Sequence, residues 1–282
     1  MKLATSSFIL SLIIFINRNI DLKKPKISII TTVKNGGAFI IETLQSINAQ
    51  TFKNFEHIIV DDGSTDNTID VINQFKKTNP LYNLKLFQPG NLGRGKALNF
   101  AVSKASSDWV AIIDADDMWH PKKLELQWKC ISLNDIDLLA TGFELFAKKD
   151  QLNFDLKNKN YEMFILKISD LLKSNKILHS SVLIRKEFCM YDELRKSQFD
   201  YELWMRLITK KNRIGLMYSK LSYHRIHKNQ SFEGSNKSTY RITSFKLNAH
   251  YCIKFFRFDI LLLKSMKLIM VLLIPRKWIH NY

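Results

Sequence analysis

The sequence predicts an α/β protein with a mostly parallel sheet flanked by helices. Two observations carry this prediction: short β-branched runs alternate with segments of helical periodicity over roughly a hundred residues, and polar clusters follow the runs directly. Such alternation gives right-handed βαβ units, in which consecutive strands lie parallel. The chain has 282 residues, of which 46% are hydrophobic, so it is long enough to bury a full core.

The first strand is predicted at Ile27–Val33, a β-branched run that ends in a turn with two glycines and leads into a helix. Further strands are predicted at 57–60, Leu84–Phe87 and 109–113, with helices near 69–75 and 94–103 between them. After Pro121 the regularity ends, and the predicted elements are a helix near 122–133, strands at Leu138–Phe146 and 181–184, and a helix near 201–209. Ligands are expected at the carboxyl ends of the strands.

The two ends of the chain differ from its middle. The apolar run 8–16 is too short to span a bilayer, and no cleaved signal peptide is expected. Residues 237–282 hold nine Lys or Arg and only one acidic residue, within a net charge of +17. We therefore expect three parts: an apolar and basic segment at 1–24, an α/β domain at 25–232, and a basic, apolar helical extension at 233–282 that associates with membrane or packs on the core.

Two acidic clusters end predicted strands, and the sheet should deliver both to the same edge. They are Asp61-Asp62 and the run from Asp114 to Asp117. Either cluster alone could be a turn, because Asp and Gly are common turn residues. Several carboxylates beside an apolar strand repel one another and favour a bound cation. Oxygen ligands without a nearby cysteine suit Mg²⁺ or Mn²⁺ and not zinc.

Five segments in order resemble the family-2 glycosyltransferases of the GT-A fold. They are IITTVKN at 29–35, VDDGSTDNT at 60–68, NLGRGKALN at 91–99, DADD at 114–117 and DYELW at 200–204. The resemblance covers roughly 26 to 231 and implies a GT-A (Rossmann-like) sheet and a nucleotide-sugar donor.

The resemblance also implies roles for individual residues. Thr32, Asn35 and Asp62 would bind the donor nucleotide, and Asp114 would lie near the donor ribose or the metal. Asp116 and Asp117 would form the metal-binding and diphosphate-binding end of the acidic run. The resemblance implies that either Arg94 or Lys96 lies near the diphosphate, although such cations are often solvated.

Asp200 is implied as the general base, with a helix N-cap as the alternative role. Phe199 stands where the family commonly has Glu or Gln, which could alter acceptor binding. His227 resembles a histidine that approaches the metal or the diphosphate, and Arg225 could pair with phosphate. A surface histidine is the alternative for His227.

Together these features predict an inverting glycosyltransferase that moves a sugar from a nucleotide-diphosphate donor, UDP-sugar by default, to a hydroxyl of a glycan or lipid-linked acceptor. Surface polysaccharide biosynthesis at the cytoplasmic, inner face of the cell membrane is the expected setting, with no nucleic acid as partner. The rivals are a sugar nucleotidyltransferase, which would carry a Gly-rich loop after the first strand, and a non-catalytic basic module that binds membrane or nucleic acid.

Overall fold

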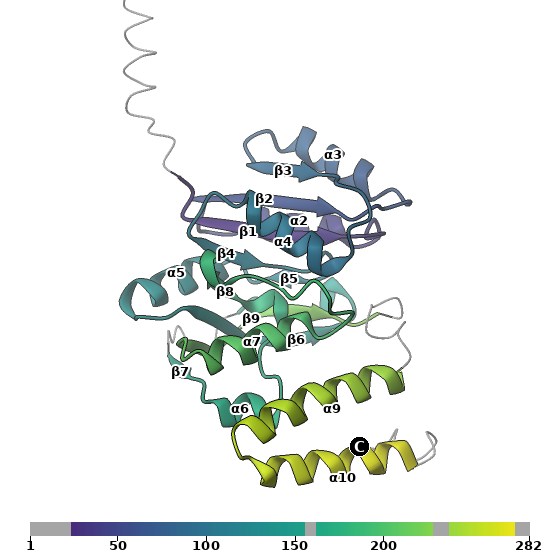
Figure 1. Cartoon of the computed structure of the whole chain (residues 1–282). Coiled ribbons are helices and arrows are strands. Elements are labelled where there is room, and N and C mark those ends of the chain that lie inside the picture. The colour runs from purple at the N-terminus through teal and green to yellow at the C-terminus, as the bar shows by residue number, and fades with distance from the viewer. Residues whose placement is uncertain (1–23, 156–161, 228–236, 274–282) are drawn as a thin grey trace, which may run out of the picture.

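The computed structural model describes residues 24–155, 162–227 and 237–273. Within these residues, nine strands form one sheet with helices on both faces (Figure 1). Along the main path of the sheet, the strand order is β3-β2-β1-β4-β8-β6-β9-β5, and β7 pairs with β9 off this path. The strands are β1 (Ile27–Val33), β2 (Phe55–Asp61), β3 (Leu84–Phe87), β4 (Trp109–Ile112), β5 (Met118–Trp119), β6 (Leu138–Phe146), β7 (Met163–Ile165), β8 (Leu183–Arg185) and β9 (Ile214–Arg225).

The first four strands form the parallel half of the sheet. β1 pairs in parallel with β2 on one side and β4 on the other, and β3 extends the sheet beyond β2. Neighbouring residues of β1 enter opposite cores: Ile29 packs with one apolar cluster and Ile30 with the other. Strands that are buried on both faces need apolar residues at nearly every position, which explains the continuous β-branched runs. The four strands predicted in this half are confirmed to within two residues at each end.

The second half of the sheet is mixed. β8 runs antiparallel to β4 and β6, whereas β6 and β9 are parallel, with a register shift near Gly142. β5 and β7 both pair antiparallel with β9. The strand predicted at 181–184 begins later in the structure, at Leu183, because a 3₁₀ turn at His179–Ser181 precedes β8. This turn carries side chains toward the site described below.

Helices cover both faces of the sheet. α2 (Ile40–Asn48), α3 (Thr68–Thr78) and α5 (Lys123–Leu133) contribute to the apolar cluster on one face. The opposite face is covered by α4 (Arg94–Lys104), α6 (Ile168–Lys173) and α7 (Phe199–Thr209). A helix on each face of a largely parallel sheet is the layer arrangement expected for an α/β fold.

Within the described residues 237–273, the C-terminal extension is helical, as predicted, and forms α9 (Lys237–Lys254) and α10 (Phe258–Leu273). The chain turns between them at Phe256, whose φ of 52° is left-handed. Tyr251, Cys252 and Ile260 belong to the same apolar core as the sheet, and the Tyr201 hydroxyl donates to Asn248 Oδ1 at 2.8 Å. The division at residue 232 stays a prediction, because residues 228–236 lie outside the described part, as does the segment 1–23. No helix in the described ranges is long and apolar enough to cross a membrane.

Candidate active site

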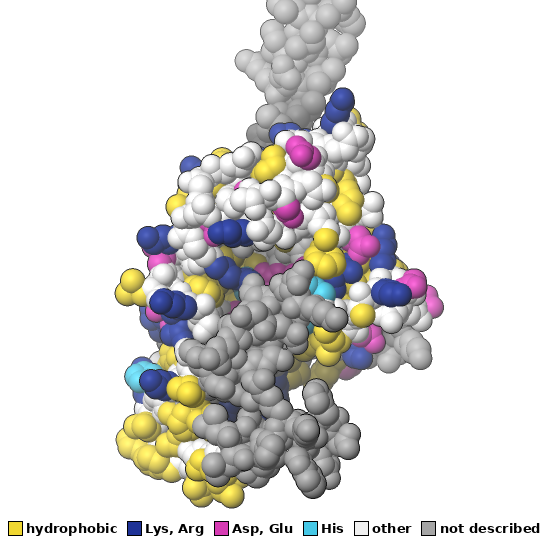
Figure 2. Space-filling model, turned by 90° about the vertical axis from the view of Figure 1, so that its right-hand side faces the viewer, with side chains coloured by type: hydrophobic (Ala, Val, Ile, Leu, Met, Phe, Trp, Pro, Cys, Tyr) yellow, Lys and Arg dark blue, Asp and Glu magenta, His cyan; other side chains and the backbone are white. Residues whose placement is uncertain are grey.

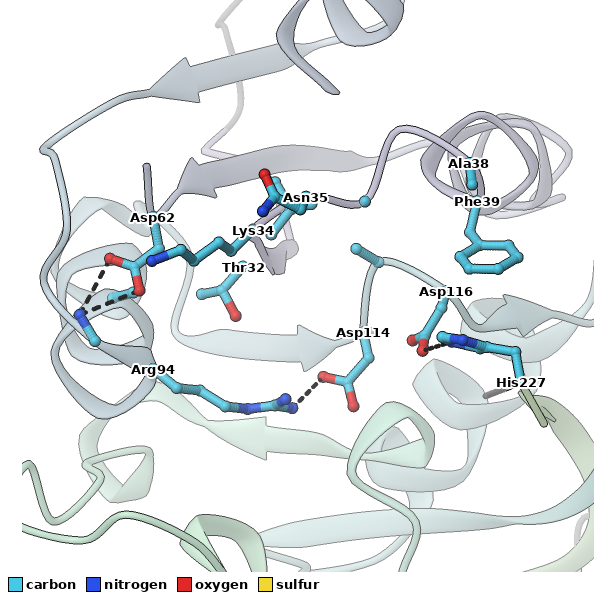
Figure 3. Close-up of a pocket in the computed structure, with 15 residues that line it drawn as sticks. Thr32, Lys34, Asn35, Ala38, Phe39, Asp62, Arg94, Asp114, Asp116 and His227 are labelled. Carbon is cyan, nitrogen blue, oxygen red and sulfur yellow. Dashed lines mark hydrogen bonds and ion pairs between the residues drawn. The ribbon is translucent and has the colours of Figure 1, made fainter. Parts of the chain in front are cut away.

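A cavity of about 470 Å³ opens at the carboxyl ends of β1, β2 and β4 (Figure 3). This is the edge at which open α/β sheets bind ligands. Seven of the eleven residues predicted for the site line this cavity. They are Thr32, Asn35, Asp62, Arg94, Asp114, Asp116 and His227. The remaining four, Lys96, Asp117, Asp200 and Arg225, do not line it.

Asp62 lies at one end of the cavity and holds the loop that begins α4. Its carboxylate accepts hydrogen bonds from the backbone amides of Leu92 at 2.6 Å and Gly93 at 3.1 Å. Gly93 has a φ of 85°, a conformation that strains any residue with a Cβ. Asp62 is buried, and its contacts set the position of the first residue of α4, Arg94, over the cavity.

The loop after β1 forms a second wall at this end. The Asn35 side-chain oxygen accepts from the Thr65 amide at 2.8 Å, and the Asn35 amide donates to Ser64 Oγ at 2.8 Å. Lys34 reaches across to Asn91, with 2.7 Å between its Nζ and Asn91 Oδ1. Loops from three strands are thereby joined around one end of the cavity.

Asp114 lies at the floor of the cavity in a chain of polar contacts. Arg94 donates to Asp114 Oδ1 at 2.8 Å, and His179 Nδ1 lies 3.1 Å from the same oxygen. The other ring nitrogen of His179 lies 2.9 Å from the Tyr191 hydroxyl. Burial alone would raise the pKa of Asp114, but the charges of Arg94 and His179 outweigh it and hold that pKa well below its usual range. Asp114 is therefore ionised at neutral pH and fixes the Arg94 guanidinium over the cavity.

Asp116 and His227 form a pair at the other end of the cavity. Asp116 Oδ2 and His227 Nε2 are 2.9 Å apart, and the imidazole packs on the Phe39 ring with 4.4 Å between the centroids. Burial, and then the negative charges of Asp117 and Asp114, raise the pKa of Asp116. A cation placed here would relieve that repulsion.

Asp117 is fully buried beneath the cavity, and both of its carboxylate oxygens are occupied. One oxygen accepts from the Arg225 backbone amide and lies 3.0 Å from His224 Nδ1, and the other accepts from the Ser180 hydroxyl. Burial would lower the pKa of His224, but the Asp117 carboxylate raises that pKa to about 9. To bind a metal, Asp117 would have to exchange these partners, so its predicted role as a ligand stays a prediction.

Arg225 does not face the cavity, contrary to the phosphate-pairing interpretation. Its guanidinium donates to the Asp116 carbonyl at 2.8 Å and to the Glu42 carboxylate, and it lies over the rings of Phe39 and Phe146. The side chain is buried, because it ties α2 to the acidic run and to β9. Arg225 therefore holds the backbone of Asp116 in place and does not contact the cavity itself.

Asp200 lies in the first turn of α7, outside the lining of the cavity. The position before the helix is occupied by Gln198, so Asp200 is not its N-cap. Asn175 donates its side-chain amide to Asp200 Oδ2 at 3.2 Å. The charge of Asp114, and to a smaller extent that of Asp200, raises the pKa of the Arg94 guanidinium, so Asp200 lies near Arg94. Phe199 packs on the core and faces Gly95 of α4, which gives its apolar character a structural reason.

Lys96 is exposed on α4, two residues beyond Arg94, and does not reach the cavity wall. Of the two cations predicted near a diphosphate, the structure brings only Arg94 to the cavity.

The cavity also contains residues that the sequence analysis missed. Lys34 and Phe39 flank the predicted Asn35 in the same loop, so their position after β1 was a usable signal. His179 contacts the predicted Asp114, and Asn175 contacts the predicted Asp200, both from far along the chain. Tyr191 contacts His179 in turn. No local pattern marks these three positions.

The residues present fit a divalent cation that is only partly held by protein. No group of three or more His, Cys, Asp or Glu side chains in the described ranges is arranged to hold a metal ion. Asp116 and His227 nevertheless offer one carboxylate and one imidazole on the cavity wall. Mg²⁺ is commonly bound by one or two carboxylates together with substrate phosphates and water, so two protein ligands suffice for such a site.

The sheet and the acidic edge of this cavity define a transferase of the GT-A type. A family model for glycosyl transferase family 2 matches residues 28–189, which is more than half of the chain. The chain belongs to this family, and its relatives are named as glycosyltransferases.

Two relatives illustrate the similarity. The chain is 28% identical over 242 residues to an uncharacterized glycosyltransferase of Methanocaldococcus jannaschii, covering 83% of this chain and 80% of that protein. It is 34% identical over 125 residues to TuaG of Bacillus subtilis, a glycosyltransferase assigned to teichuronic acid biosynthesis, covering 44% of this chain and 49% of TuaG. The chain spans between 35% and 59% of the length of several matched Rickettsia relatives.

Two solved structures share the fold. S. aureus TarS in complex with UDP-GlcNAc has a TM-score of 0.64 and 22% identity, over 79% of this chain and 65% of that one. The mannosyltransferase PcManGT from Pyrobaculum calidifontis, in complex with GDP-Man and Mn²⁺, has a TM-score of 0.58 and 17% identity, over 83% of this chain and 65% of that one. The GT-A fold predicted from the sequence is confirmed.

Proposed function

We propose that the protein is an inverting glycosyltransferase that uses a nucleotide-diphosphate sugar, with a UDP-sugar as the donor. The observation that carries the proposal is a single cavity that brings together the aspartates at the strand ends, Arg94 and the Asp116–His227 pair. The chain that forms this cavity belongs to glycosyl transferase family 2. The UDP-GlcNAc bound by TarS supports the choice of nucleotide.

The donor lies along the cavity in this proposal. Thr32, Asn35 and Asp62 hold the nucleoside at the end where the loops after β1 and β2 meet, and Asp114 lies beside the ribose. Arg94 approaches the diphosphate, because its guanidinium is already held over the cavity by Asp114. A fixed guanidinium loses little freedom when it pairs with phosphate oxygens. Lys96, exposed on α4, would add only distant charge to this binding.

Asp116 and His227 hold the divalent cation, Mg²⁺ or Mn²⁺, and the Mn²⁺ in the PcManGT complex supports this cofactor. When bound, such a cation neutralises the charge that develops on the leaving nucleoside diphosphate. Asp117 contributes by holding His224 and Arg225 in place behind Asp116. The alternative is that Asp117 binds the cation directly. The variants Asp116→Asn and Asp117→Asn distinguish these two roles.

Asp200 is the general base. The acceptor hydroxyl oxygen forms a bond to the anomeric carbon as the bond from that carbon to the diphosphate oxygen breaks, and Asp200 takes the hydroxyl proton. One displacement from the face opposite the leaving group inverts the anomeric configuration. Asn175 orients the base, because its amide binds one oxygen of the carboxylate and leaves the other for the proton.

The acceptor is a hydroxyl of a glycan or a lipid-linked glycan, and the reaction belongs to surface polysaccharide biosynthesis at the inner face of the cell membrane. The similarity to TuaG supports this class of acceptor. The net charge of +17 supports a setting next to an anionic surface.

The test is donor turnover by the purified full chain, with Mn²⁺ or Mg²⁺, across UDP-, GDP- and dTDP-sugars. Nucleotide release should depend on the metal and fall in Asp116→Asn and Asp200→Asn. Asp108→Asn is the matched control, because Asp108 is an exposed carboxylate that pairs with Lys24 away from the cavity. Equal release by all four proteins would overturn the site assignment.

A further inference from the structure

The outward face of α10 is apolar where a surface helix is normally polar. Five large hydrophobic side chains on this helix are between 53% and 67% exposed. They are Phe258, Leu262, Leu263, Met266 and Ile269. At 100° per residue they fall within an arc of about 140°. Asp259 lies in the same arc, and its carboxylate is paired with Arg257. Exposed apolar patches of this kind mark interaction sites in natural proteins.

The other face of α10 already packs on the protein. Ile260 is buried in the main core, Leu261 packs against it, and burial lowers the pKa of Lys264. The outward face is thus a second apolar surface on one helix and is not needed for the contact with α9. An amphipathic helix that only covers a core carries polar residues on its outer side.

Neighbouring residues extend this apolar surface beyond α10. Ile253 and Phe256, at the turn from α9, are 55% and 80% exposed. Figure 2 shows hydrophobic side chains gathered at the lower end of the molecule, where α9 and α10 lie, with Lys and Arg side chains above them in that view. We name the seven residues the α10 surface, which comprises Ile253, Phe256, Phe258, Leu262, Leu263, Met266 and Ile269.

Charge indicates what covers the α10 surface. Lys254 and Lys267 are exposed beside it, and residues 237–282 hold nine basic residues against Asp259 alone. A second copy of the chain would bring a surface with the same positive charge against this one, which electrostatic repulsion disfavours. An anionic bilayer offers apolar chains beneath negative headgroups, and both features match.

We propose that the α10 surface docks on an anionic lipid bilayer, with Phe256, Phe258 and the outward residues of α10 entering the headgroup region while Lys254 and Lys267 meet lipid phosphates. The proposal requires no sugar donor and no acceptor. It therefore stands or fails separately from the glycosyltransferase reaction.

The test is sedimentation of the full chain with vesicles of equal parts phosphatidylglycerol and phosphatidylcholine, compared with vesicles of phosphatidylcholine alone. The wild type should bind the anionic vesicles, more weakly at high salt. Leu262→Glu/Met266→Glu should lower the partition coefficient about tenfold or more, because two apolar side chains no longer leave water. Lys254→Gln/Lys267→Gln should lower it several-fold on anionic vesicles only.

Leu81→Glu/Leu133→Glu is the matched control, with the same change of charge at residues that are 99% and 72% exposed after α3 and at the end of α5. It should bind vesicles as the wild type does, and both glutamate variants should keep the thermal melt and the vesicle-free donor turnover of the wild type. Equal vesicle binding by the two glutamate variants would overturn the proposal. So would a wild-type dimer in sedimentation velocity that only Leu262→Glu/Met266→Glu dissociates, since the surface would then bind a second copy.

Discussion

The parallel half of the sheet and the half that follows it contribute to the site in different ways. β1, β2 and β4 deliver polar residues to the cavity at their own carboxyl ends, so each residue is placed by the strand just before it. The later half contributes side chains across long separations: Asp114 contacts His179, 65 residues away, and Asp116 contacts His227, 111 residues away. In the proposed function, the first half therefore provides the donor-binding edge and the second half completes it for catalysis.

The largest expected effect separates binding from catalysis. Asp200→Asn should lower kcat by about 10²- to 10⁴-fold, because a positioned base contributes that much to proton transfer. The dissociation constant of the donor, measured by calorimetry, should stay close to the wild-type value, since Asp200 lies outside the cavity lining. Asp108→Asn, at an exposed carboxylate that pairs with Lys24 away from the cavity, is the control and should leave both quantities unchanged. A variant that loses donor affinity in proportion to kcat would assign Asp200 to the donor edge.

The next comparison concerns the two neighbouring carboxylates. Asp117→Asn should lower the free energy of unfolding by about 2–3 kcal/mol, because it weakens a buried carboxylate that holds Ser180, His224 and Arg225. Asp116→Asn should instead weaken activation by Mn²⁺ about tenfold or more, with little change in unfolding. Urea unfolding and Mn²⁺ titrations of activity measure the two effects. If Asp117→Asn is as stable as the wild type and loses Mn²⁺ activation, Asp117 is a ligand.

A pH effect tests the interior of the parallel half. His57 of β2 is fully buried between Thr31 and Tyr82, and burial lowers its pKa from 6.5 to about 3. At pH values between these two pKa values, the unfolded chain binds a proton at His57 that the folded chain does not bind. The free energy of unfolding therefore decreases as the pH drops. Between pH 7 and pH 5 the loss should be about 2 kcal/mol.

Urea unfolding at both pH values should show a smaller loss for His57→Gln than for the wild type. His250→Gln serves as the control, because His250 is exposed on α9 and its replacement should leave the pH dependence unchanged. An identical pH dependence for the wild type and His57→Gln would show that the ring takes up a proton as readily in the folded protein as in the unfolded chain.

The smallest effect concerns the orientation of the base. Asn175→Ala should lower kcat about tenfold with little change in the KM of the donor, because one hydrogen bond to the Asp200 carboxylate is lost. In the Asp200→Asn background the same substitution should have almost no further effect. Additive losses in the double variant would show that Asn175 acts independently of Asp200.

The sequence predicted the parallel half well because its signals are local. A β-branched run, a polar turn and an amphipathic helix each lie within a few residues, so β1 and β3 were predicted with their observed bounds. Seven predicted site residues meet in the cavity for the same reason, since most of them end a strand or begin a helix.

What the sequence did not reveal depends on contacts between distant segments. Asp116 and Asp117 are adjacent and chemically identical. Asp116 nevertheless faces the cavity, whereas Asp117 is enclosed by residues from η2 (His179–Ser181) and β9. Arg225 looked available for phosphate because nothing nearby in the sequence reveals that Glu42 lies beside it. Side-chain direction at these positions is determined by packing, which no short pattern encodes.

The hydrogen bonds of Asp62 have a consequence for altering donor preference. One carboxylate lines the end of the cavity assigned to the nucleoside and also fixes the amides of Leu92 and Gly93, so it sets where Arg94 begins α4. If the donor binds as proposed, engineering the nucleobase preference through Asp62 would therefore shift the diphosphate contact at the same time. Thr32 lies in the central strand β1, where it pairs with Val60 of β2, and it is the better position for a library that exchanges one base for another.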